Sequence, residues 1–155
     1  MPIYILIMLT ISYRDTVLLT VVFLLSGLVV QLLKHTVFVN IDRPVKYLEG
    51  SYQLHLVKGV GQYAHQSFPS GHSASAFGIF LCFALVVKQK WLKLCLFVLA
   101  CLIAYSRVYL SQHFLGDILA GSLIGVITAI VCYPWIYSYN KDWLNKKLSF
   151  HKKNE

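Results

Sequence analysis

Two histidines and one carboxylate are the residues of this chain most suited to chemistry. His113 and Asp117 are four residues apart, a spacing that places both side chains on one face of a helix. Asp117 can then hold one imidazole nitrogen as N–H, which leaves the other nitrogen of His113 free to attack phosphorus. His72, from a different segment, would protonate the leaving group as a general acid. These residues predict a phosphohistidine intermediate, and no step in that chemistry requires a metal or another cofactor.

Several potential phosphate ligands accompany the three catalytic candidates. A phosphoryl group in transfer spreads negative charge over its equatorial oxygens, so a catalyst must surround them with hydrogen-bond donors. Guanidinium groups can bind two of these oxygens at once, and an ammonium group adds a point charge. Free backbone N–H groups at the start of a helix bind anions as well. The expected phosphate ligands are Lys34, Arg43, Ser70, Gly71 and Arg107.

Apolar helices must position these residues. Of the 155 residues, 57% are hydrophobic, which is more than the surface of a soluble domain permits. A helix that crosses a bilayer needs about 20 mostly apolar residues. Stretches that meet or approach this length are 16–33, 74–87 with a start near Pro69, 91–105 and 118–139. We expect an all-α polytopic membrane bundle with four transmembrane helices, preceded by a short apolar segment, residues 3–11, that forms half of a helix.

The basic residues predict the orientation of this bundle. If the spans alternate, Arg14, the connection 88–93 and the basic tail 141–155 share one side, which the positive-inside rule makes cytoplasmic. The candidate site then lies at the extracytoplasmic end of a single membrane domain, residues 1–155, whose catalytic bundle is 16–140. The net charge of +8 does not indicate a nucleic-acid partner, because such a surface would combine basic and aromatic residues on one soluble face. The four cysteines lack a CxxC spacing, so neither a zinc site nor a disulfide framework is expected.

Three short blocks connect the chain with a known family. They are residues 34–44, residues 68–72 with the sequence FPSGH, and residues 106–117 with the sequence SRVYLSQHFLGD. Together they resemble the type 2 phosphatidic acid phosphatase superfamily, and the second and third blocks match its pattern at every defined position. The first block departs from the pattern, because eight residues separate Lys34 from Arg43 where the family usually has six. If Lys34 ends its helix and residues 39–42 form a turn, the ammonium still reaches the pocket that holds Arg43.

The resemblance implies the same residue roles, with His113 as nucleophile, His72 as acid and Asp117 as the partner of His113. It implies hydrolysis of a membrane lipid phosphomonoester or diphosphate, such as phosphatidic acid, phosphatidylglycerol phosphate, undecaprenyl diphosphate or lipid A phosphate. The short chain has no room for a headgroup domain, which favours a prenyl diphosphate in a bacterial inner membrane. Family members commonly have six spans, so the resemblance also implies that one helix and part of another are missing before Met1.

Two other functions compete with the phosphatase hypothesis. A transporter or scaffold that binds anionic lipid without turnover would explain ionisable residues at membrane depth. It would not explain why His72, His113 and Asp117 occur together. A vanadium-dependent haloperoxidase has a comparable pocket, because vanadate mimics phosphate, but those enzymes are soluble and this chain is too apolar. Phosphate release from a lipid phosphate in the presence of EDTA separates turnover from mere binding.

Overall fold

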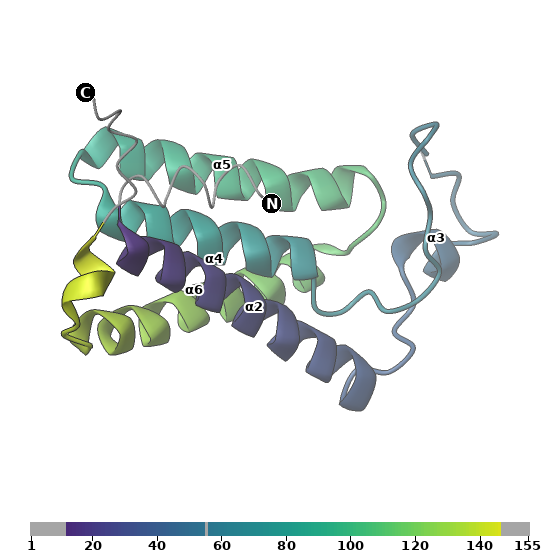
Figure 1. Ribbon diagram of the computed structural model, residues 1–155. Helices are drawn as coiled ribbons and strands as arrows, with labels where there is room; N and C mark the ends of the chain where they lie inside the picture. Colours follow the sequence, from purple (N-terminus) through teal and green to yellow (C-terminus); the bar gives the residue numbers. More distant parts are fainter. Residues whose placement is uncertain (1–11, 55, 147–155) are drawn as a thin grey trace, which may run out of the picture.

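In the part of the chain that the structure describes, the fold consists of four long helices and two short ones (Figure 1). The computed structural model describes residues 12–54 and 56–146. The long helices are α2 (Tyr13–Thr36), α4 (Gly71–Val86), α5 (Lys90–Tyr109) and α6 (Leu115–Ser138), and the short ones are α3 (Pro44–Tyr47) and the 3-10 helix η1 (Asp142–Asn145). The described residues contain no strand, which confirms the prediction of an all-α fold. The apolar segment 3–11 and the tail residues 147–155 lie outside the described residues.

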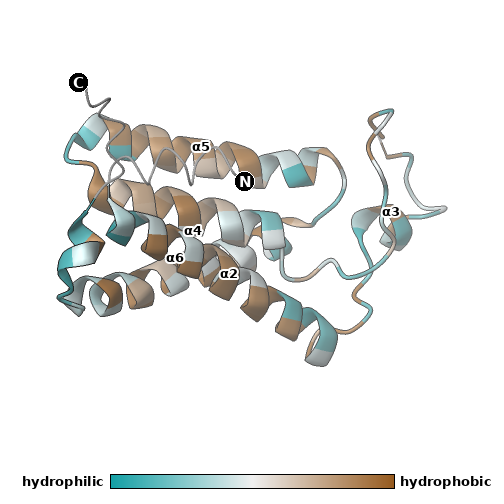
Figure 2. Cartoon of the chain, in the orientation of Figure 1, coloured by the Kyte–Doolittle hydropathy of each residue, from teal (hydrophilic) through white to brown (hydrophobic). Residues whose placement is uncertain are grey.

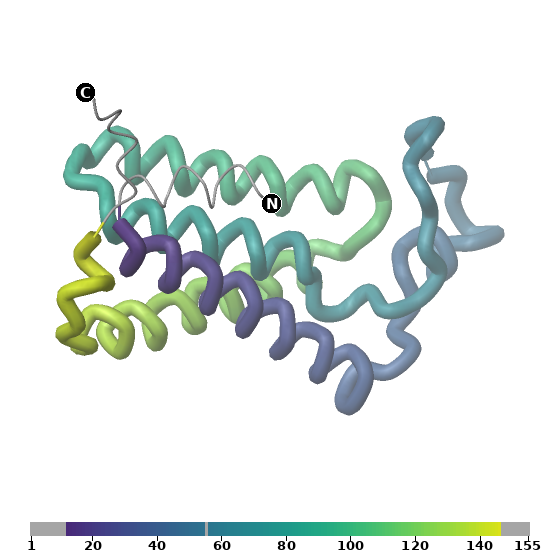
Figure 3. Tube along the Cα trace, viewed as in Figure 1, coloured from purple at the N-terminus to yellow at the C-terminus, as the bar shows by residue number. Residues whose placement is uncertain are grey.

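The long helices alternate in direction, as the tube in Figure 3 shows. The C-terminal ends of α2 and α5 and the N-terminal ends of α4 and α6 are directed toward one end of the bundle, where α3 and its flanking loops also lie. The connection between α4 and α5 and the helix η1 lie at the opposite end. Because the helix directions alternate, the candidate site residues lie at one end of the bundle and Arg14, Lys88 and Lys141 lie at the other, as expected from the sequence.

Three of the four long helices, α2, α5 and α6, are long and apolar enough to cross a membrane. The fourth, α4, has 16 residues, which amounts to about 24 Å at 1.5 Å per residue. That is less than the roughly 30 Å of a bilayer's hydrocarbon core. The prediction of four clear spans is therefore confirmed for three helices only. Helix α4 begins at Gly71, two positions after Pro69. Pro69 itself lies outside the first turn, because Ser70 has extended backbone and caps the helix by accepting the Ser73 N–H.

Helix α4 lies at the centre of the bundle and packs against α2, α5 and α6. Its contact with α6 depends on two glycines four residues apart, Gly121 and Gly125. A Cβ atom at Gly121 would collide with the Ser70 carbonyl oxygen, and one at Gly125 would collide with the Ala74 carbonyl oxygen. Small residues at such spacing let helix backbones approach closely in membranes. This packing brings the start of α4 directly against the start of α6.

Large apolar side chains cover the outside of the bundle. Five that are more than half exposed are Leu24, Leu28, Leu102, Leu123 and Ile127. Figure 2 shows hydrophobic colour along the middle of the helices and hydrophilic colour concentrated toward their ends and in the flanking segments. Apolar surface in water costs about 25 cal/mol per Å², so an exterior of this kind suits hydrocarbon as the surrounding medium. The chain thus has the features of an integral membrane protein.

Candidate active site

His113 and Asp117 are in contact, but not because they share a helical face. His113 precedes α6, which begins at Leu115. The prediction that one helix carries both residues is therefore wrong. The contact forms because the Asp117 carboxylate reaches back over the helix N-terminus, where its Oδ2 accepts the Phe114 N–H at 2.9 Å. The same oxygen lies 3.3 Å from His113 Nδ1, so one carboxylate both caps α6 and orients the imidazole.

Ser67 is a third donor to this carboxylate, and the sequence motifs did not single it out. Its hydroxyl donates to Asp117 Oδ2, and the side chain is fully buried. Several donors on one buried oxygen fix the position of the carboxylate and therefore of the imidazole beside it. Ser67 stands one position before the FPSGH block. Its position as a short polar residue next to that block was the only sign in the sequence that Ser67 could belong to the site. Its distance from Asp117 along the chain gave no indication that the two side chains are in contact.

The surroundings of His113 favour the neutral imidazole. Burial lowers the pKa of His113 from its usual value of 6.5, and the hydrogen bond with Asp117 opposes this shift. At neutral pH the ring therefore carries one proton, which the adjacent carboxylate holds on Nδ1. The lone pair of Nε2 remains available, which is the state that a nucleophile requires.

Lys34 and Arg43 meet at one backbone carbonyl despite their unusual spacing. Lys34 Nζ donates to the Gln66 oxygen at 2.9 Å, and Arg43 Nη2 approaches the same oxygen at 3.5 Å. Helix α2 continues to Thr36, and residues 37–40 form a turn in which Asn40 has a φ of +61°. The two additional residues are accommodated in this connection, slightly before the turn expected at 39–42.

Two further carbonyl groups hold Arg43 in place. Its Nε donates to the His65 oxygen at 2.9 Å, and its Nη1 donates to the Gln112 oxygen at 3.3 Å. Burial lowers the pKa of Arg43, while the nearby Asp117 carboxylate raises it. The guanidinium is therefore fixed between the long loop and the segment that carries His113.

Arg107 lies beside the cavity and does not line it. Its Nη1 donates to Gln112 Oε1 at 3.1 Å, and its Nε donates to Ser106 Oγ at 3.3 Å. Gln112 is buried and also donates to the Gly61 oxygen at 3.3 Å. Gln112 therefore links both arginines, Arg43 through its carbonyl and Arg107 through its side chain. The motif leaves its position undefined, so no sequence signal marked it.

The start of α4 offers N–H groups, but not the one expected from Ser70. The Ser70 N–H donates to the Asp117 carbonyl oxygen at 3.0 Å, so it is already used. Among the described residues, the N–H groups of Gly71 and His72 have no hydrogen-bond partner, as is usual in the first turn of a helix. Both residues line the cavity. The free N–H groups of this helix terminus thus belong to Gly71 and His72, and anion binding by them stays a prediction.

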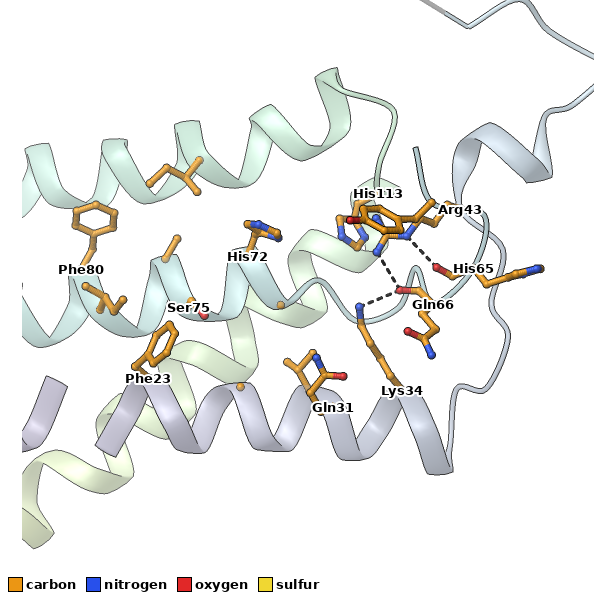
Figure 4. A pocket seen from close by; sticks show the side chains of 17 residues that line it. Phe23, Gln31, Lys34, Arg43, His65, Gln66, His72, Ser75, Phe80 and His113 are labelled. Atoms are coloured by element: carbon orange, nitrogen blue, oxygen red, sulfur yellow. Dashed lines mark hydrogen bonds between the residues drawn. The ribbon is translucent and has the colours of Figure 1, made fainter. Parts of the chain in front are cut away.

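A cavity of about 800 Å³ joins these groups (Figure 4). Its polar end is lined by residues from separate segments of the chain, namely Lys34, Arg43, Gly71, His72 and His113. Its other end is apolar and is lined by Phe23, Gly27, Ala76, Ile79, Phe80 and Ile103. The arrangement can hold an anion next to a nucleophilic imidazole while hydrocarbon occupies the same cavity.

Known proteins share parts of this sequence. A sequence profile of the PAP2 superfamily matches residues 15–141. The lipid A 4′-phosphatase of Bacteroides thetaiotaomicron is 36% identical over 58 residues, which are 37% of this chain and 26% of the relative. Lipid phosphate phosphatase 1 of Arabidopsis thaliana is 40% identical over 86 residues, and the match covers 47% of this chain and 26% of the relative. The chain thus matches about a quarter of the length of each of these relatives.

A solved structure shares the fold as well. The crystal structure of Aquifex aeolicus LpxE aligns with a TM-score of 0.62 and 31% sequence identity, over 77% of this chain and 67% of that chain. The family profile extends over most of the described bundle and includes every residue of the candidate site. The chain therefore belongs to the PAP2 superfamily, as its motif blocks predict.

Proposed function

We propose that this protein is a phosphatase that hydrolyses the phosphomonoester or diphosphate of a membrane lipid through a phosphohistidine intermediate. One observation carries the proposal, namely a single cavity that has His113 and His72 with cationic groups at one end and an apolar lining at the other. A lipid phosphate has the same division between an anionic head and a hydrocarbon tail. The names of the relatives support the proposal, since both describe phosphatases of lipids.

In the first chemical step, His113 Nε2 attacks phosphorus while the bond from phosphorus to the lipid oxygen breaks. Lys34, Arg43 and the free N–H groups of α4 hold the equatorial oxygens. His72, which is exposed to the cavity, donates a proton to the departing oxygen. Asp117 stays ionised and stabilises the positive charge that develops on His113.

In the second step, water attacks the phosphohistidine. His72, now without its proton, accepts one from the water as the new bond from oxygen to phosphorus forms. The bond between phosphorus and His113 Nε2 breaks, inorganic phosphate leaves, and both histidines return to their starting states. Arg107 would act as a further phosphate ligand after its guanidinium turns from the Gln112 side chain toward the bound anion.

The proposed location is a bacterial inner membrane, with the site at the extracytoplasmic side. Helices α2, α4, α5 and α6 would cross the bilayer, and the substrate would enter the cavity with its tail toward the apolar end. The charge distribution supports this orientation, because the basic residues Arg14, Lys88 and Lys141 lie at the end of the bundle opposite His113.

The test is release of inorganic phosphate from a lipid phosphate by the purified protein in detergent, with EDTA present throughout. Wild-type protein should release phosphate, and His113→Ala, purified in parallel, should not. The alternative function, a transporter or scaffold for anionic lipid, predicts binding of the same lipid with no release by either protein. That second result would contradict the proposal.

A further inference from the structure

Two uncharged polar side chains divide the cavity between its charged and apolar ends. They are Gln31 on α2 and Ser75 on α4, and both line the cavity. Figure 4 shows them between Lys34 on one side and Phe23 and Phe80 on the other. The proposed reaction does not use either residue.

Both residues are placed one helical turn from a residue of the phosphate-binding end. Gln31 precedes Lys34 by three positions on α2, and Ser75 follows His72 by three positions on α4. Three positions correspond to about 4.5 Å along a helix axis. Because the two helices run in opposite directions, both steps lead from the charged end toward the apolar end. Figure 4 shows Gln31 nearer to Lys34 and Ser75 nearer to Phe23, so the two walls offer polar groups along the passage from the charged to the apolar end.

Neither polar group is satisfied within the described part of the protein. Other hydroxyl groups on the same helices are bonded, since Ser26 donates to the Phe23 oxygen and Ser73 donates to Ser70 Oγ. The Gln31 amide and the Ser75 hydroxyl have no such partner among the described residues. Gln31 is exposed and Ser75 is half-buried, so both groups are accessible from the cavity. A bound molecule that covers them must offer polar atoms at this depth, because a polar group buried without a partner costs free energy.

We infer that Gln31 and Ser75 form a subsite for oxygen atoms next to the substrate phosphate. The inference rests on the proposed function, because it takes the phosphorus atom to be bound beside His113. One helical turn from the phosphate-binding residues, the cavity wall faces substrate atoms that lie a few bonds from phosphorus. In a glycerolipid or glycolipid phosphate these atoms include ester, ether or hydroxyl oxygens, whereas a prenyl chain has only carbon there.

The preferred substrate class is therefore a lipid phosphate with an oxygen-bearing linker. Hydrocarbon at this depth leaves the amide and the hydroxyl without partners, and sites built for a hydrogen bond discriminate against molecules that lack it. This reverses the expectation of a prenyl diphosphate, which depended on chain length alone. Gln31 and Ser75 would thus determine specificity without taking part in the chemical steps.

The test compares kcat/KM of the purified full chain for three substrates in the same detergent. These are dioleoyl phosphatidic acid, a lipid A-type sugar phosphate and farnesyl phosphate. Wild-type protein should favour the better of the first two over farnesyl phosphate by about tenfold or more, as expected for hydrogen bonds to a partly exposed subsite. Comparison of the first two substrates distinguishes a glycerol linker from a sugar linker.

The variants Gln31→Leu and Ser75→Ala should each lower kcat/KM for the oxygen-bearing substrate by about fivefold to tenfold. They should not lower the farnesyl phosphate value, because they remove the polar groups that hydrocarbon leaves without partners. Matched controls are Gln89→Leu, which is exposed at the far end of the bundle, and Ser122→Ala, whose hydroxyl bonds only to its own helix. Equal wild-type values for all substrates, or variants that lower every value equally, would overturn the inference. No turnover of any lipid phosphate would instead contradict the proposed function itself, and the subsite with it.

Discussion

At the scale of single residues, the two histidines differ in their surroundings as a nucleophile and an acid should. His113 is 3% exposed and lies against Asp117, which fixes the direction of its ring. His72 is exposed to the open cavity and has freer access to a leaving group or to water. The proposed roles of His113 as nucleophile and His72 as acid can be tested by changing one residue at a time.

His113→Ala should abolish turnover and any trapped phosphoenzyme, because no other group can accept the phosphoryl group. A loss on the order of 10⁴-fold or more is expected for removal of a nucleophile. His72→Ala should lower the rate by roughly 10²-fold to 10⁴-fold with an alkyl lipid phosphate. It should slow formation of the intermediate much less with p-nitrophenyl phosphate, whose leaving group needs no proton. Rapid-quench measurement of the phosphoenzyme checks both results, and a wild-type rate for His113→Ala would exclude the mechanism.

The pH dependence of kcat/KM should report the state of His113. Burial lowers its pKa below 6.5, so the neutral, nucleophilic form persists as pH falls and is lost only below that value. The acid limb of the profile should therefore have its midpoint below pH 6.5. Asp117→Asn removes the interaction that raises the pKa, so its residual activity should show a midpoint at still lower pH. Both proteins should be measured with one substrate, so that ionisation of the substrate affects the two profiles equally. An acid limb with its midpoint above pH 6.5 would contradict the assignment of this limb to His113.

Lys34 and Lys46 provide a matched pair for the first motif block. Lys34 is buried and bonded at the polar end of the cavity, whereas Lys46 is exposed and pairs with Asp42 at 3.9 Å. Lys34→Met should lower kcat by about a hundredfold, the typical effect of removing one preorganised transition-state donor. Lys46→Met should change kcat by less than about threefold, because exposed ion pairs contribute little. The opposite pattern would mean that a loop lysine, and not Lys34, contacts the phosphate.

At the scale of elements, the packing of α4 on α6 determines where the site forms. The backbone contact at Gly121 and Gly125 holds the N-terminus of α4 beside Asp117, whose carbonyl accepts the Ser70 N–H. The long connection between α2 and α4 contributes as well, since it carries Arg43 and Ser67. Loss of the close helix approach should therefore affect both stability and catalysis.

Gly125→Ala should destabilise the bundle by roughly 1–3 kcal/mol, the usual cost of overpacking a well-packed contact. The added Cβ atom would collide with backbone atoms of Ala74 and Gly78, which cannot move without displacing α4. Gly116→Ala is the control, because a Cβ atom there meets nothing within 4 Å. Thermal unfolding in detergent should show a lower midpoint for Gly125→Ala only. Equal midpoints for the two variants would show that the helices do not need this approach.

At the scale of the whole molecule, the candidate site and the basic connection between α4 and α5 lie at opposite ends of the bundle. The polar end of the cavity lies at the end of the bundle that carries α3 and the long loop, and the basic connection between α4 and α5 lies at the other end. Under the proposed function, this polarity would determine which leaflet supplies the substrate.

Thiol labelling on intact cells can establish the orientation. In a background without the four native cysteines, Gln53→Cys should react with a membrane-impermeant reagent, and Gln89→Cys should react only after the cells are permeabilised. Both positions are exposed and lie at opposite ends of the bundle, so accessibility differs only through the membrane. The reverse result would place the site in the cytoplasm and exclude an extracytoplasmic lipid as substrate.

The sequence by itself identified the candidate site residues and the elements that carry them. The proposed phosphoryl transfer calls for particular residue types, so the blocks around His72 and His113 and the cations Lys34 and Arg43 were candidates from residue type and motif. Apolar runs long enough for a bilayer likewise predicted α2, α5 and α6, because hydrocarbon demands continuous helices.

Only the tertiary structure decided how these groups touch. Ser67 and Asp117 are 50 positions apart, and their contact exists because Gly121 and Gly125 let α4 approach α6. In the same packing, the Ser70 N–H donates to the Asp117 carbonyl oxygen. The Asp117 carboxylate reaches His113 across the start of α6. Local patterns could not predict these contacts, because they depend on which backbone atoms two helices bring together and not on the residues within either helix.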